Sequence, residues 1–126
     1  MTTKRRDNHS TEFGLWLRDQ EAISSGNGFL ATNLDFIWTN YTTKNWMMIE
    51  EKRYMSFPKP WQQKMFRAID KAARSDINYR GFHLLMFEKT SPTDGRIFLN
   101  FTKNEITLNQ LLEFLMFKKA YRPFFP

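Results

Sequence analysis

The sequence contains no cysteine among its 126 residues and only two histidines, His9 and His83. Without cysteine there is no disulfide framework and no thiolate nucleophile. Two histidines far apart in the chain do not supply the ligand spacing of a zinc site. His83 lies inside the apolar run from Phe82 to Phe87, which favours a buried, hydrogen-bonded histidine over a catalytic one. Cysteine–histidine catalysis and zinc hydrolysis are therefore not expected.

Long hydrophobic runs and glycine-rich motifs are also absent. No stretch approaches the roughly 18 apolar residues that cross a bilayer, and the segment Met1–Asp7 lacks the apolar core of a signal peptide. The 5 glycines form neither a phosphate-binding loop nor a dinucleotide fingerprint, and no Gly-x-Ser-x-Gly is present. The sequence predicts a soluble, cytoplasmic protein with no membrane partner.

Aromatic residues and positive charge are abundant instead. Aromatic side chains make up 17% of the sequence, enough to build the core of one domain spanning residues 1–126. The formal net charge is +6, which favours a polyanionic partner such as nucleic acid. Residues 1–9 are expected to form a flexible basic arm. The basic, aromatic tail at residues 118–126 is expected either to fold back on the domain or to present a docking patch.

The order of periodic segments predicts an α+β (α/β) fold with the order α-β-β-α-β-β-α, in which helices flank a central mixed sheet. Ser10 or Thr11 caps the first helix, and a capping box, Thr107–Gln110, opens the last. The expected elements are a helix from Glu12, a hairpin within Asn33–Lys52, a helix over residues 61–74, strands at 81–89 and 96–100, and a helix ending near Phe117.

The hairpin places three charged residues together. If its turn is centred between Thr42 and Thr43, antiparallel pairing sets Asp35 opposite Glu50. Side chains alternate between faces, so Lys52 shares the face of Glu50 while the side chain of Glu51 points to the other. A slip of one residue would separate Asp35 from the others, so the cluster depends on register.

This set resembles the PD-(D/E)xK nuclease superfamily, especially Holliday-junction-resolvase-like and small phage nucleases. Asp35 matches the aspartate of the first core strand, Glu50-Glu51-Lys52 matches the E-x-K, and Glu12 matches a glutamate of the first helix. Leu34 replaces the proline of the motif, and the resemblance spans about Glu12 to Lys52.

The resemblance implies a nuclease-like fold and a metal-dependent endonuclease that cuts DNA, including branched or recombining DNA. Asp35, Glu50 and Lys52 would be catalytic. Mg²⁺ or Mn²⁺ would be held by Glu12, Asp35, Glu50 and the backbone carbonyl of Glu51. Cutting two strands also suggests a homodimer.

The helix over residues 61–74 has two distinct faces. Gln62 or Gln63 would support the site, as the resemblance implies. An apolar stripe contains Trp61, Met65, Ala68, Ile69 and Ala72. A basic ridge, suited either to a phosphate backbone or simply to solvent, contains Lys64, Arg67, Lys71 and Arg74.

Each functional interpretation has a structural alternative. Asp35 and Lys52 could form a structural ion pair, Glu50 could be an edge-strand charge, and Glu12 could complement the helix dipole. The alternative to a nuclease is a non-catalytic nucleic-acid-binding or interaction protein on the same scaffold.

Overall fold

A computed structural model describes residues 11–126, so the predicted arm at residues 1–9 lies outside the described part of the chain. The chain divides into two compact units, with the boundary between Thr32 and Asn33. None of the helices within residues 11–126 is long and apolar enough to cross a membrane.

Over residues 11–32, the first unit contains one short α-helix, α1 (Glu12–Arg18), followed by two single-turn 3₁₀ helices. Thr11 caps α1, because its side-chain hydroxyl accepts a hydrogen bond of 3.0 Å from the backbone N–H of Gly14. Glu12 lies in the first turn, as predicted. Phe13 and Trp16 stack on one another, with their ring centroids 6.0 Å apart, and both remain exposed.

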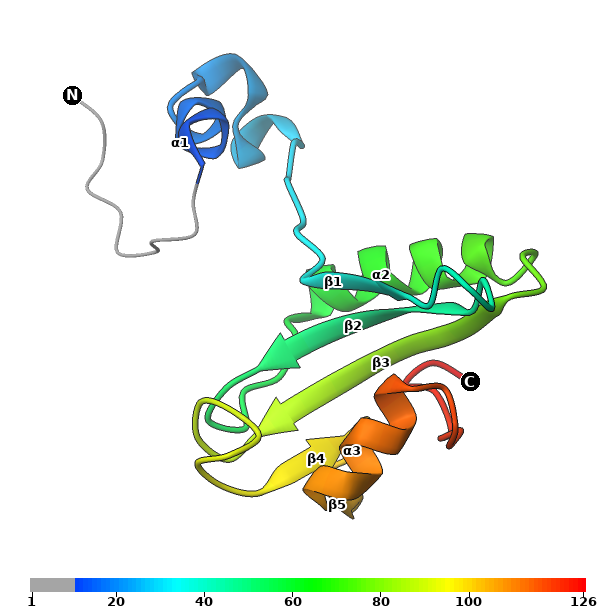
Figure 1. Cartoon of the computed structure of the whole chain (residues 1–126). Coiled ribbons are helices and arrows are strands. Elements are labelled where there is room, and N and C mark those ends of the chain that lie inside the picture. The colour runs from blue at the N-terminus through cyan, green and yellow to red at the C-terminus, as the bar shows by residue number, and fades with distance from the viewer. Residues whose placement is uncertain (1–10) are drawn as a thin grey trace. The chain divides into compact units, whose positions relative to one another are not determined.

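The second unit is a five-stranded mixed sheet with two helices, which confirms the α+β class (Figure 1). The strands lie side by side in chain order; β2 and β3 are parallel and the other pairs are antiparallel. The predicted order of elements is found, with one additional short strand. The elements are β1 (Phe36–Thr39), β2 (Trp46–Lys52), α2 (Pro60–Ala73), β3 (Tyr79–Phe87), β4 (Ile97–Leu99), β5 (Glu105–Ile106) and α3 (Leu108–Leu115).

The two faces of the sheet bury different clusters of apolar side chains. Met47 and Ile49 of β2 pack with Leu111 and Phe114 of α3 on one face. Met48, between them in the sequence, packs with Phe66 of α2 on the other face. Helix α3 lies in front of the strands in Figure 1 and α2 lies behind them.

The predicted hairpin register is confirmed. Phe36 pairs with Ile49 and Trp38 with Met47, which is the alignment given by a turn centred between Thr42 and Thr43. Asn40 organises that turn, because its side-chain oxygen accepts hydrogen bonds from the backbone N–H groups of Thr42 and Thr43.

Helix α2 meets the sheet through a face other than its apolar stripe. Phe66 and Asp70 are the buried residues of the helix, whereas Trp61, Met65 and Ile69 are exposed. Asp70 is tolerated in this interface because the Tyr79 hydroxyl donates to it at 2.6 Å and the Arg74 guanidinium lies at 2.7 Å.

The C-terminal tail folds back on the second unit. The backbone N–H of Phe124 donates to the carbonyl of Phe82 on β3 at 3.0 Å, and Phe125 is buried beside Phe66. Arg74 donates to the carbonyl of Pro126 at 2.8 Å. Of the two roles expected for the tail, the structure shows the packing role.

Candidate active site

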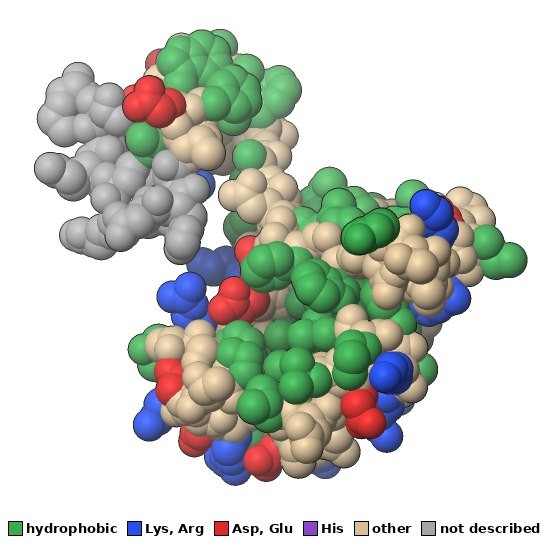
Figure 2. Space-filling view, viewed as in Figure 1, with side chains coloured by type: hydrophobic (Ala, Val, Ile, Leu, Met, Phe, Trp, Pro, Cys, Tyr) green, Lys and Arg blue, Asp and Glu red, His purple; other side chains and the backbone are tan. Residues whose placement is uncertain are grey.

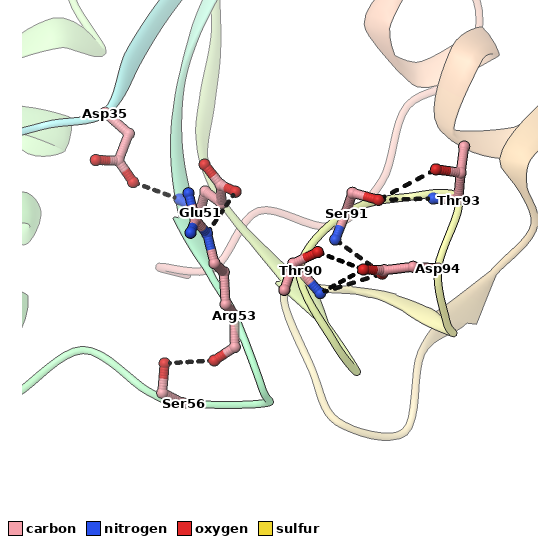
Figure 3. Close-up of polar contacts among 8 residues, drawn as sticks. All are labelled: Asp35, Glu51, Arg53, Ser56, Thr90, Ser91, Thr93 and Asp94. Atoms are coloured by element: carbon pink, nitrogen blue, oxygen red, sulfur yellow. Dashed lines mark hydrogen bonds and ion pairs between the residues drawn. The ribbon is translucent and has the colours of Figure 1, made fainter. Parts of the chain in front are cut away.

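Asp35 and Glu50 meet where the chain enters β1 and where β2 approaches its end. The backbone N–H of Asp35 donates to Glu50 Oε1 at 3.2 Å. In return, the backbone N–H of Glu51 donates to Asp35 Oδ2 at 2.8 Å (Figure 3). These two bonds continue the hairpin ladder through side chains, so the register that pairs β1 with β2 also fixes the two carboxylates.

Glu50 is buried, with only 3% of its surface exposed, on a strand that is covered by β1 and β3 on either side. Its partner across the parallel pair is Leu84, and Met86 follows opposite Lys52; both apolar side chains are fully buried. This surrounding excludes water from the carboxylate. The expectation of a simple edge-strand charge is therefore wrong, because β2 is an internal strand.

The pKa of Glu50 is raised from 4.5 to about 7, chiefly by burial and secondly by the negative charge of Asp35. The hydrogen bond from the Asp35 backbone and the positive charge of Lys52 oppose this shift. Near neutral pH, Glu50 therefore exchanges a proton readily. A carboxyl group with this property can take up or release a proton, or exchange the proton for a bound cation.

Lys52 completes the cluster from the same face of β2. Its Nζ lies 3.5 Å from Glu50 Oε2, and its side chain is 19% exposed. Glu51, one residue earlier, pairs instead with Arg53 at 3.6 Å (Figure 3). The alternation of the strand therefore separates a buried acid–lysine pair from a more exposed glutamate–arginine pair.

The donor atoms suit a hard divalent cation. Two carboxylates that repel one another, one of them desolvated, are stabilised by a positive ion between them, and oxygen donors are those that Mg²⁺ and Mn²⁺ prefer. Asp35 and Glu50 would supply these oxygens. Within residues 11–126, no group of three or more acidic, histidine or cysteine side chains is placed to hold a metal ion. The role of the Glu51 carbonyl stays a prediction.

Three further predicted site residues are Glu12, Gln62 and Gln63. Glu12 belongs to the first unit, and its participation stays a prediction. Gln62 accepts a hydrogen bond from the backbone N–H of Lys59, and Gln63 donates to the carbonyl of Pro58. Both glutamines thus have contacts at the start of α2, and their support of the site stays a prediction.

The basic ridge of α2 divides into two pairs. Arg74 is bound to Asp70, and Arg67 lies over the ring of Phe125 at 5.1 Å, so these two arginines contact the protein itself. Lys64 and Lys71 are exposed, and no ion pair holds either within the described part of the chain.

No family model, curated protein or solved structure matches this chain. Functional interpretation therefore depends on the cluster itself.

Sequence reasoning missed the apolar residues that enclose Glu50. Leu84 and Met86 belong to β3, which follows α2 in the sequence. Their alignment with β2 is set by a crossover connection through α2 rather than by a turn. No local signal defines that register. The apolar run from Phe82 to Phe87 indicated only that the strand would be buried.

Proposed function

We propose that this protein is a metal-dependent nuclease of the PD-(D/E)xK type that hydrolyses phosphodiester bonds in DNA, with branched DNA as a candidate substrate. The observation that carries the proposal is the cluster of Asp35, Glu50 and Lys52, in which the backbone N–H of Asp35 bonds to the Glu50 carboxylate and Lys52 Nζ lies 3.5 Å from it. The net charge of +6 supports a polyanionic substrate.

Each residue has a role that its surroundings support. Asp35 and Glu50 would hold Mg²⁺ or Mn²⁺, and the ion would lower the pKa of a bound water and polarise a phosphoryl oxygen. Lys52, beside Glu50, would orient the attacking water or stabilise developing negative charge. The raised pKa of Glu50 means that metal binding and proton release are coupled at this site.

A second function, binding of nucleic acid without cleavage, is favoured by a separate observation. Glu50 already accepts a backbone hydrogen bond and has Lys52 as its ion-pair partner, so the cluster is satisfied as a structural unit.

Cleavage of supercoiled plasmid and of a synthetic four-way junction separates the two functions. With Mg²⁺ or Mn²⁺, we expect the wild type to nick DNA, and we expect Asp35→Ala, Glu50→Gln and Lys52→Ala each to reduce the rate by about 100-fold or more. Excess EDTA should abolish nicking.

Glu105→Gln is the matched control, because Glu105 is an exposed glutamate on β5 that pairs only loosely with Arg96 at 3.9 Å. It should cut like the wild type. If the wild type and all variants bind DNA alike and none cuts it, the non-catalytic function is correct.

A further inference from the structure

The edge strand β1 lacks the features that usually protect a sheet edge. It is the outermost strand, with β2 on one side only, and all four of its residues, Phe36–Thr39, are exposed. None of them is charged or a proline, and charges and prolines are the common means of blocking strand addition. Within residues 33–126 no strand pairs with its outer backbone edge, which can therefore accept another strand.

Apolar side chains surround this edge on both faces of the sheet. Ile37 is paired with Met48 and therefore points to the α2 side, whereas Phe36 and Trp38 point to the α3 side. Trp38 is held there by its indole N–H, which donates to the carbonyl of Leu115 at 2.7 Å. Beside Phe36 and Trp38 lies a mostly apolar groove of about 270 Å³ that also includes Leu85 and Phe87.

The exposed stripe of α2 continues the same surface. Arg67 and Arg74 contact the C-terminal tail, which runs along β3, so the basic flank of α2 faces the β3 side. Trp61, Met65 and Ile69, at spacings of four residues, occupy the opposite flank. That flank therefore faces the side of the sheet on which β1 lies.

We call this surface the β1 patch. It consists of six side chains, each between 39% and 65% exposed: Phe36, Ile37, Trp38, Trp61, Met65 and Ile69. At roughly 200 Å² for a fully exposed large side chain, the patch presents about 600 Å² of apolar area. Two such patches give about 1,200 Å², the lower limit for a specific, stable protein–protein interface.

We propose that the β1 patch is the interface between two copies of this chain, which join edge to edge through antiparallel β1 strands. An antiparallel edge pairs with itself about a two-fold axis, so the same surface serves both partners. The absence of charge in the patch matters because each copy carries a net charge of +6, and repulsion at the contact is avoided. Phe36 and Trp38 of the two copies would meet on one face and Ile37 on the other.

Sedimentation velocity of the full chain over a range of concentrations tests the proposal without reference to activity. We expect a dimer for the wild type and at least a tenfold higher dissociation constant for Ile37→Lys and for Met65→Lys. Ile77→Lys is the matched control, because Ile77 is 89% exposed but lies outside the patch, in the turn before β3. It should dimerise like the wild type.

A second measurement does not depend on destabilising variants. Because the chain contains no cysteine, single cysteines placed in turn at positions 36, 37, 38 and 39 report directly on self-pairing. At least one should form an intermolecular disulfide under mild oxidation, while Ile77→Cys should not. Disulfides form only when the two Cα atoms lie within about 7 Å.

Two results would overturn the proposal. One is a wild-type chain that remains monomeric at all concentrations. The other is a dimer that neither Ile37→Lys nor Met65→Lys weakens and that none of the four β1 cysteines crosslinks. Both results leave the proposed nuclease function standing, because a monomer can also cut DNA.

Discussion

At the scale of single residues, Glu50 has the most informative environment. It is a carboxyl group on an internal strand, between apolar neighbours and beside a second carboxylate. The sequence identified Asp35, Glu50 and Lys52 as a cluster because the turn fixes the hairpin register. It could not reveal the depth of burial, which depends on Leu84 and Met86 from another part of the chain.

The pKa of Glu50 predicts how stability changes with pH. Between pH 4.5 and about pH 7, Glu50 is more often protonated in the folded protein than in the unfolded chain. The contribution of Glu50 to the free energy of unfolding therefore falls as the pH rises through this window. Above pH 7 this contribution is lost. Glu50→Gln resembles the protonated state, so it should be more stable than wild type at pH 8, by roughly 3 kcal/mol, and similar to it below pH 4.5.

Urea unfolding at pH 4.5, 6 and 8 in the presence of EDTA measures this difference. Glu105→Gln, measured in parallel, is the control for removing a carboxyl group from an exposed position. A Glu50→Gln variant that is destabilised equally at pH 8 and pH 4.5 would contradict the assigned pKa.

At the scale of elements, the hairpin and the capping box of α3 followed from the sequence, but the orientation of α2 did not. The Thr107 hydroxyl accepts from the Gln110 N–H and the Gln110 side chain accepts from the Thr107 N–H, as the local motif predicts. In α2, by contrast, the apolar stripe is exposed, and the helix is docked through Phe66 and a satisfied Asp70. Hydrophobic periodicity alone cannot show that a buried aspartate has partners.

The Asp70 contacts should therefore make a large contribution to the packing of α2. We expect Asp70→Ala to lower the unfolding free energy by about 2–3 kcal/mol, since it leaves the Tyr79 hydroxyl without its partner and removes one of the partners of the half-exposed Arg74 guanidinium. Tyr79→Phe should cost about 1–2 kcal/mol. Tyr41→Phe is the control, because Tyr41 is 83% exposed.

Chemical denaturation of the three variants provides the measurement. In the double variant, Asp70→Ala/Tyr79→Phe, the losses should be less than additive because the two residues share one interaction. Full additivity would show that the Tyr79–Asp70 bond makes no net contribution.

At the scale of the whole molecule, the charge distribution predicts how DNA binding responds to salt. All four residues of the α2 ridge are exposed, but Arg67 and Arg74 contact the tail, whereas no ion pair within residues 11–126 holds Lys64 or Lys71. Lys64→Gln and Lys71→Gln should each weaken DNA binding and reduce the slope of log affinity against log salt by about one unit.

Fluorescence anisotropy with a labelled duplex at several salt concentrations gives that slope. Lys103→Gln, an exposed lysine in the turn after β4, should leave the slope unchanged. Equal effects of all three variants would mean that binding follows net charge alone and that the ridge has no special role.

The parallel pairing of β2 with β3 also determines the stage of folding at which the Glu50 side chain becomes buried. The β1–β2 hairpin closes across a short turn, whereas β2 meets β3 only after α2 has crossed between them. Contacts that are close in sequence form earlier than those that enclose a long loop. When the hairpin has formed but β3 has not yet docked, we expect the pKa of Glu50 to be that of an ordinary solvated carboxylic acid. Its uptake of a proton near neutral pH belongs to the late event in which β3 docks.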